Sequence, residues 1–205
     1  MYCQNCGSKN ESDSKFCQNC GVKLSNSQQE KKEEKQIANI EYFAISPKRL
    51  ALFSILTSGI YQVYWFYKNW EAIKKAERQN ISPLLRSLFA VFFCHGLFKR
   101  VLGSSKSHGY KELYSPGWHA AAYIVLLLFG NILSIDESTN ASIVWLVAVS
   151  VSFIPLLSVQ RAINFNNEKL KEGSSFKQGF SGGEVALIVI GVIWSLLILI
   201  GIFLS

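Results

Sequence analysis

The chain has 205 residues, of which 49% are hydrophobic and 17% charged, and its formal net charge is +7. A soluble globular domain carries about 25% charged residues. The shortage of charge is concentrated after residue 117, where apolar runs approach the length of a membrane span. This composition excludes an ordinary soluble enzyme, and it also excludes intrinsic disorder over most of the chain.

The pentapeptide Cys-Gln-Asn-Cys-Gly occurs twice near the N-terminus and supplies Cys3, Cys6, Cys17 and Cys20. Each C-x₂-C pair places two thiolates on one tight turn, and the following glycine permits a positive φ there. Four thiolates with no open position indicate a structural metal site. One Zn²⁺ is the expected cofactor, and a rubredoxin-like iron is the main competitor. Because about 24 residues cannot bury a stabilising core, we expect the metal to hold residues 1–24 together as a small β-rich zinc ribbon.

A pair of disulfides is the alternative use of these four cysteines. Disulfides need an oxidising compartment, and no signal peptide precedes Cys3. We therefore expect reduced cysteines and a cytosolic N-terminus. The fifth cysteine, Cys94, lies in an apolar run and is expected to be a small buried hydrophobic residue.

A polar stretch rich in Gln, Lys and Glu follows the ribbon, so we place a linker at residues 25–45 and a helical domain at 46–205. Three serine–proline pairs, which begin at Ser46, Ser82 and Ser115, each precede an apolar stretch. A serine N-cap with proline at the first helical position is a signature of a helix start. A fourth start is expected near residue 181, where a serine and a glutamate have the spacing of a capping box.

Five apolar segments follow these start signals. They cover residues 50–67, 84–98, 120–135, 143–159 and 185–204. The last segment has 20 residues without a charge, which matches the hydrocarbon core of a bilayer. The third and fourth segments are expected to form a helical hairpin. Pro155, inside the fourth, is tolerated in a membrane helix where neighbouring groups satisfy the freed carbonyl.

The sequence does not decide whether the first two apolar segments span the membrane or lie in its interface. Aromatic residues crowd the end of the first, as in an interfacial belt, so Trp65 and Trp70 are predicted to lie at headgroup depth. Gly59 is a candidate break for a re-entrant hairpin. The second segment is short for a span and contains Arg86 and His95, a candidate intramembrane polar site. The alternative, which we favour, is an interfacial segment whose basic side chains reach lipid headgroups.

The distribution of charge predicts an orientation. Residues 42–117 carry eleven Lys and Arg against three Glu, whereas residues 118–159 carry only Asp136 and Glu137. The positive-inside rule therefore places the basic segments in the cytoplasm and the C-terminus outside. Two arrangements remain: five spans, or three spans with residues 47–98 re-entrant and interfacial. The rule favours the second, because five spans would place the basic residues at 68–80 outside.

Two stretches resemble known families. The pattern YCQNCG…FCQNCG is similar to the minimal double-knuckle zinc ribbons at the start of many bacterial proteins. Residues 52–73, LFSILTSGIYQVYWFYKNWEAI, resemble a family of small bacterial membrane proteins of unknown function that share the motif G-I-Y-x-x-Y-W-F-Y-K-x-W. This second resemblance is strongest over residues 46–100. It implies a bacterial inner-membrane protein and brings no established activity.

The sequence contains no nucleophile elbow, zinc-protease motif or phosphate-binding glycine loop, and we expect no enzymatic activity. Gln160, Asn164, Asn167 and Lys171 recur at i, i+4, i+7 and i+11. On a helix they would form one polar stripe. The stripe is interpreted either as a docking site for a partner or the ribbon, or as an ordinary solvated helix face.

We therefore predict a mostly α protein, in which a polytopic α-helical membrane domain follows a small zinc ribbon. The predicted function is that of a membrane interaction or scaffold protein in the bacterial inner membrane, whose cytosolic ribbon binds a protein partner. A small oligomeric channel or transporter is the alternative. The bilayer is an expected partner and a homo-oligomer is compatible with either function. Nucleic acid is not expected to bind, since the ribbon lacks a basic surface.

Overall fold

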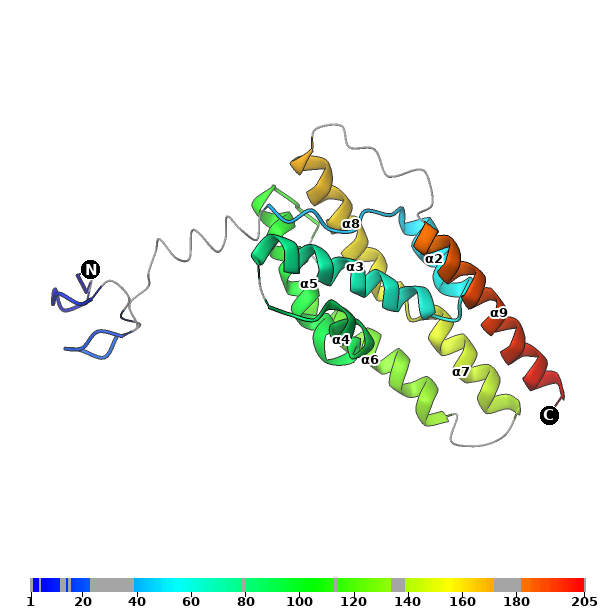
Figure 1. The fold of residues 1–205 in the computed structure, drawn as a ribbon. Coiled ribbons are helices and arrows are strands. Elements are labelled where there is room, and N and C mark those ends of the chain that lie inside the picture. Colours follow the sequence, from blue (N-terminus) through cyan, green and yellow to red (C-terminus); the bar gives the residue numbers. More distant parts are fainter. Residues whose placement is uncertain are drawn as a thin grey trace.

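The computed structural model describes residues 2–3, 5–11, 14, 16–22, 39–78, 80–112, 114–133, 139–171 and 182–204 (Figure 1). Within them the chain forms the helices α2 (Pro47–Leu56), α3 (Ile60–Glu77), α4 (Pro83–Leu88), α5 (Ala90–Ser107), α6 (Pro116–Leu133), α7 (Thr139–Val151), α8 (Ile154–Leu170) and α9 (Gly182–Leu204). The prediction of a mostly helical protein is confirmed.

The prediction of a β-rich ribbon is wrong for the part of the ribbon that the structure describes. There, β structure is limited to single bridge residues, namely Tyr2 and Lys9, which pair in an antiparallel bridge, and Phe16, with no strand. The backbone N–H and C=O groups instead form hydrogen bonds within turns around the cysteines. Most of the predicted linker, residues 25–38, lies outside the described residues.

The serine–proline pairs begin helices as predicted. Ser46 caps α2 by accepting a hydrogen bond from the backbone N–H of Arg49 at 3.2 Å, and Ser82 caps α4 in the same way. Helix α6 begins at Pro116, directly after Ser115. These caps satisfy backbone N–H groups that have no partner within the helix. The serine of the fourth start signal lies outside the described residues, and α9 begins at residue 182.

The first apolar segment turns where the sequence predicts, between α2 and α3. Gly59 has a φ of +84°, and a Cβ at this position would lie 2.7 Å from Cγ1 of Val149. The turn therefore needs glycine both for its backbone conformation and for its close approach to α7. As a result, α2 and α3 form a hairpin whose tip lies against α7 (Figure 1).

Two other apolar segments are divided as well. The segment 84–98 breaks at Phe89 between α4 and α5, which the sequence analysis did not predict. The segment 143–159 breaks between α7 and α8, and Pro155 lies in the first turn of α8. Proline is tolerated there because the N–H groups of a first helical turn have no partner in the helix.

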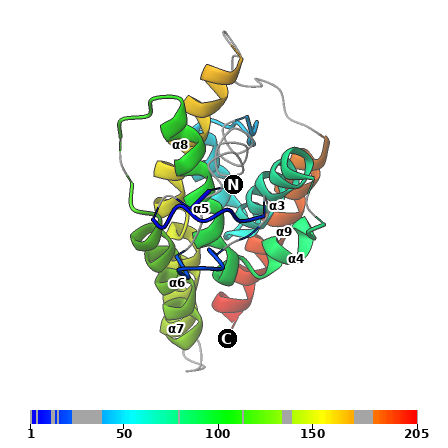
Figure 2. The same cartoon turned by 90° about the vertical axis from the view of Figure 1, so that its left-hand side faces the viewer.

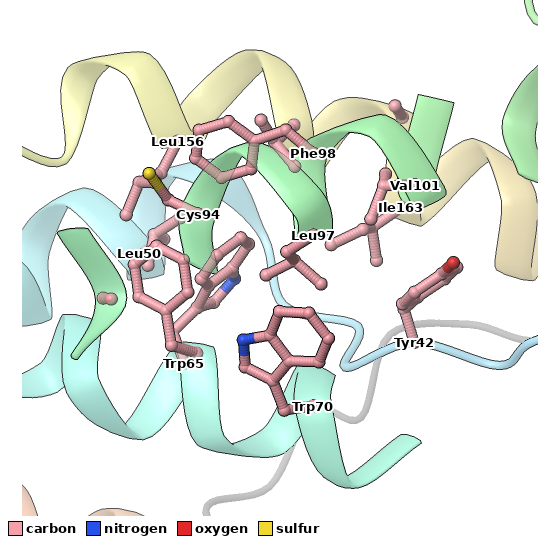
Figure 3. Close-up of a cluster of buried hydrophobic side chains, with 14 of the residues drawn as sticks. Tyr42, Leu50, Trp65, Trp70, Cys94, Leu97, Phe98, Val101, Leu156 and Ile163 are labelled. Carbon is pink, nitrogen blue, oxygen red and sulfur yellow. The ribbon is translucent and has the colours of Figure 1, made fainter. Parts of the chain in front are cut away.

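The core lies where α3, α5 and α8 meet (Figure 3). Trp65 is 0% exposed and Trp70 1% exposed, and both project from α3 toward Leu97 and Phe98 of α5 and Leu156 of α8. The two indoles thus lie inside the protein and not on a surface that faces lipid, contrary to the interfacial-belt interpretation. The physical reason is that α5 and α8 bury this face of α3, and large aromatic side chains fill the space between the three helices.

Three helices extend beyond the rest of the molecule at one end, where α6, α7 and the C-terminal half of α9 lie side by side (Figures 1 and 2). Two helical stretches are long and apolar enough to cross a membrane, Val144–Leu170 and Gly182–Gly201. The first is 50% buried within the protein and the second only 11%. A buried core helix passes the same criterion of length and composition, so the exposure of α9 is the more informative observation.

Candidate functional site

Each cysteine pair of the ribbon sits on the same kind of turn. The N–H of Gly7 donates to the carbonyl of Cys3 at 2.8 Å, and the N–H of Gly21 donates to the carbonyl of Cys17 at 2.9 Å. The two glycines have φ values of +70° and +69°. The duplicated pentapeptide therefore folds into two equivalent knuckles, since both copies need the left-handed conformation that glycine adopts freely.

The two knuckles bring their four sulfur atoms together. All four lie within 4.8 Å of one another, with Cys3 and Cys20 at 3.6 Å and Cys6 and Cys17 at 3.5 Å. Ligands at 2.3 Å from a tetrahedral Zn²⁺ place their sulfurs about 3.8 Å apart. The cluster thus fits a single tetrahedral metal ion, and the donor set of four thiolates is that of a structural site.

Amide side chains support the cluster across the two knuckles. Nδ2 of Asn5, in the first knuckle, donates to the sulfur of Cys20 at 3.8 Å, and Nδ2 of Asn19, in the second, donates to the sulfur of Cys6 at 3.9 Å. Each asparagine therefore stabilises negative charge on a thiolate of the opposite knuckle. Such outer partners orient and tune metal ligands.

Ser8 breaks the symmetry of the two knuckles. Its Oγ lies 3.0 Å from the sulfur of Cys6 and 3.1 Å from that of Cys17, whereas the second knuckle has Val22 at the matching position. The hydroxyl of Ser8 is the largest cause that lowers the pKa of Cys17, to about 5. A thiolate is the form that binds metal, so this contact favours the liganding state. Ser8 was not among the predicted site residues, although its departure from the duplicated pattern was a usable signal.

The polar stripe of α8 contacts an extended segment of the same chain, residues 40–45, which we call the strap. Asn167 binds both backbone groups of Tyr42: its Oδ1 accepts from the N–H at 3.1 Å and its Nδ2 donates to the carbonyl at 2.6 Å. Asn164 donates to the carbonyl of Ile45 at 3.0 Å, and Gln160 donates to that of Phe43 at 3.3 Å. The stripe therefore binds its own chain at residues that the sequence analysis assigned to the linker.

Further side chains complete the strap site. Asn166 donates to the carbonyl of Ile40 at 2.8 Å, and Asn69 of α3 accepts from the N–H of Phe43 at 3.1 Å. At the exposed end, Lys171 forms an ion pair with Glu41 at 2.7 Å. We call Asn69, Gln160, Asn164, Asn166 and Asn167 the amide ladder.

The amide ladder takes the place of a neighbouring strand. A buried extended segment must satisfy its backbone N–H and C=O groups, and side-chain amides supply both a donor and an acceptor. Asn69 and Asn166 were missed from the sequence. Their signal was asparagine in a helix interior, where its low propensity calls for a compensating contact.

Arg86 and His95 are not brought together. The guanidinium of Arg86 lies 4.4 Å from the ring centroid of Trp70 and 5.2 Å from that of Phe93. His95 is exposed on α5, and its imidazole makes no hydrogen bond or ion pair with the part of the chain that the structure describes. The structure therefore gives Arg86 an aromatic environment and gives the pair no shared site. Cys94 is 0% exposed, which confirms the prediction that it is buried.

Comparison with known proteins bears on the N-terminal part. Neither curated proteins nor solved structures yield a match to the chain. The family model of the zinc-ribbon domain matches residues 2–24, the segment that holds the four clustered cysteines. The chain therefore begins with a zinc-ribbon domain, built from two C-x₂-C-G knuckles, ahead of its helices.

Proposed function

We propose that this protein is a multi-pass membrane protein that carries its zinc ribbon on the cytosolic side, where the ribbon binds a protein partner. The observation that carries the membrane part of the proposal is the apolar end formed by α6, α7 and α9. Large apolar side chains are exposed there: Val125, Leu128, Phe129, Val144, Val147, Ile193, Trp194, Leu196, Leu197, Leu199 and Ile200. Soluble proteins rarely expose contiguous apolar surface on this scale.

The charge pattern supports the same placement. No Lys, Arg, Asp or Glu occurs at residues 117–135, 138–160 or 185–205. Charges are gathered at the opposite end, on α3, on the C-terminal part of α5 and on α8 after residue 160. An uncharged end of three helices beside a basic end is the pattern that the hydrocarbon core and the positive-inside rule produce. We therefore propose three spans: α6, α7 continued into α8, and α9.

Contacts of the α2–α3 hairpin support the re-entrant arrangement. The chain enters α2 from Ile45, which is bound by Asn164 of α8. It turns at Gly59 beside Val149 of α7, and α3 then returns so that Asn69 binds the strap. The hairpin thus begins and ends at the same level of the molecule. In this proposal it dips into the cytosolic side of the bilayer without crossing it, and the N-terminus lies in the cytosol.

The ribbon is proposed to bind a protein and not to catalyse a reaction. Its metal site has four protein ligands and no position left for a substrate. Several buried polar groups between the helices are bonded to one another, as in the pairs Gln62–Ser152 and Trp65–Gln160. Paired groups of this kind favour helix packing over a permeation path, so we retain the scaffold function and not a channel or transporter.

Topology is tested with a membrane-impermeant thiol reagent in intact cells. Single cysteines are placed at positions 75, 138 and 205 in a variant that lacks Cys94, while the ribbon cysteines stay inside. We expect labelling at 138 and 205 and protection at 75. Labelling at 75 would support five spans, and protection at 138 would overturn the orientation.

The ribbon's role is tested by affinity capture from solubilised membranes with the full chain as bait. Cys17→Ser should lose specific partners while the protein remains in the membrane fraction, and Cys94→Ser serves as a matched control that should retain them. An identical set of captured proteins for both variants would refute the binding role of the ribbon.

A further inference from the structure

A second exposed apolar surface lies where α4 meets α5. Its side chains are Leu84, Leu85, Leu88, Phe89 and Phe92, which we call the wedge. Phe92 is the most exposed at 78%, and the others are 54–60% exposed. Residues 83–107, which span both helices, contain no Asp or Glu. The wedge is therefore apolar and lies on an element whose only full charges are positive.

Arg86 lies between Leu85 and Leu88 in the sequence, is half-buried at the edge of the wedge, and packs against aromatic rings. Its guanidinium lies over Trp70 and Phe93, and that of Arg100 lies 5.8 Å from the centroid of Trp70. Arg100 pairs with Glu77 at 3.3 Å. Arg86 forms no ion pair with any carboxylate in the part of the chain that the structure describes.

A bound anion would therefore stabilise the charged guanidinium of Arg86 in these surroundings. Desolvation, followed by the charge of nearby Arg100, lowers the pKa of Arg86, and Glu77 offsets this only in part. A guanidinium between apolar side chains and a second guanidinium gains from a phosphate, which accepts two parallel hydrogen bonds. Phosphate groups beside an apolar surface are the chemistry of a lipid headgroup region.

The position of the wedge along the helix axes also favours a place in the lipid headgroup region. The hydroxyl of Tyr114, just before α6, donates to the carbonyl of Phe98 at 2.6 Å. From there α6 runs toward the apolar end while α5 runs away from it (Figure 1), so the start of α5 lies nearer that end. Phe92 lies about 9 Å before Phe98 along the helix axis. The wedge is thus level with the first turns of α6, where a span would enter the bilayer.

We propose that the wedge inserts into the cytosolic headgroup region of the bilayer and that Arg86 binds the phosphate of an anionic lipid there. The wedge supplies the apolar contact, and Trp70 and Phe93 hold the guanidinium at the boundary between water and acyl chains. This inference rests on the membrane placement proposed above, and the experiment is designed to separate the two.

The depth of the wedge is measured on the full chain in vesicles of phosphatidylcholine and phosphatidylglycerol. An environment-sensitive fluorescent amino acid replaces Phe92 or, in a second protein, Ile193 at the centre of α9. Lipids labelled near the headgroup should quench position 92 most, and lipids labelled near the chain end should quench position 193 most. Quenching at 193 without quenching at 92 would overturn the inference alone, and would leave the wedge as a surface for protein. No quenching at 193 would overturn the membrane placement itself.

The role of Arg86 is measured as preference for spin-labelled phosphatidylglycerol over spin-labelled phosphatidylcholine. A basic side chain at a membrane surface is worth about 1 kcal/mol, so Arg86→Gln should lower this preference about fivefold. Lys99→Gln, an equal charge change at an exposed position of α5, should lower it less, and Arg86→Lys should retain most of it. Equal losses in Arg86→Gln and Lys99→Gln, or none in either, would overturn the headgroup site. If Arg86→Gln does not fold, the quenching at position 92 still decides the proposal.

Discussion

Replacing Asn167 by alanine should release the strap from α8. Asn167 is 6% exposed and binds both the N–H and the carbonyl of Tyr42, which is itself 3% exposed. Alanine leaves these two backbone groups without their partners in a buried position. Each such group costs about 1–3 kcal/mol, and partial access of water to the strap favours the lower half of this range, so we expect a total of about 2–4 kcal/mol.

The assay is amide hydrogen exchange of residues 40–45, measured by mass spectrometry on the full chain in detergent or nanodiscs. Exchange through local opening follows the free energy of that opening. A loss of about 2–4 kcal/mol therefore corresponds to roughly 30- to 700-fold faster exchange of the strap, since 1.4 kcal/mol is a factor of ten. Exchange of the buried core of α5 should change far less, because the strap can open without unfolding it.

Two control variants provide a scale for the faster exchange expected in Asn167→Ala. Asn164→Ala removes one bond to the carbonyl of Ile45 from a half-buried position and should have an intermediate effect. Lys171→Ala removes an ion pair with Glu41 in which both side chains are more than half exposed, worth at most about 1 kcal/mol. If Asn167→Ala exchanges no faster than Lys171→Ala, the reasoning is refuted, and the strap is held by its buried apolar side chains alone.

Further predictions concern the ribbon and the helix packing. Cys17→Ser should abolish metal binding and unfold the ribbon, as read by elemental analysis and proteolysis, while the helices remain inserted. Ser8→Ala should weaken metal affinity about tenfold in chelator competition, since a lost outer partner costs about that much, and an unchanged affinity would show that its contacts to sulfur are incidental. Cys94 should resist maleimide in the folded protein, because burial raises the pKa of its thiol to about 11. Gly191→Ala should lower the unfolding temperature, since its Cβ would lie 2.4 Å from side-chain carbons of Thr57, the C-cap residue of α2. Gly201→Ala, which meets nothing within 4 Å, should not.

Local sequence patterns predicted the structural features that depend only on residues close together in the chain. The duplicated cysteine motif defined the metal centre, because each knuckle is closed by hydrogen bonds within five residues. The serine–proline pairs gave the starts of α2, α4 and α6 for the same reason. The break at Gly59 was also visible, since a positive φ restricts the residue type at the position itself.

Contacts between segments that are far apart in the sequence could not be predicted from such local patterns. Trp65 and Trp70 have the composition of an interfacial belt, yet they fill the core, because the packing of α5 and α8 on α3 decides which face is buried. The break between α4 and α5 at Phe89 was not predicted, because no glycine or proline lies there in the sequence. The spacing of Gln160, Asn164 and Asn167 predicted a polar stripe, but left open whether water or a partner would meet it.

By itself the sequence determined the ribbon, the helix starts and the apolar character of the last helices, since each follows from residue type and spacing over a few turns. Only the tertiary structure decided that residues 40–45 are the partner of the stripe on α8. Their hydrogen bonds join residues more than a hundred positions apart. A side-chain amide presents the same donor and acceptor to water as to a peptide, so its partner is fixed only when folding brings the two segments together.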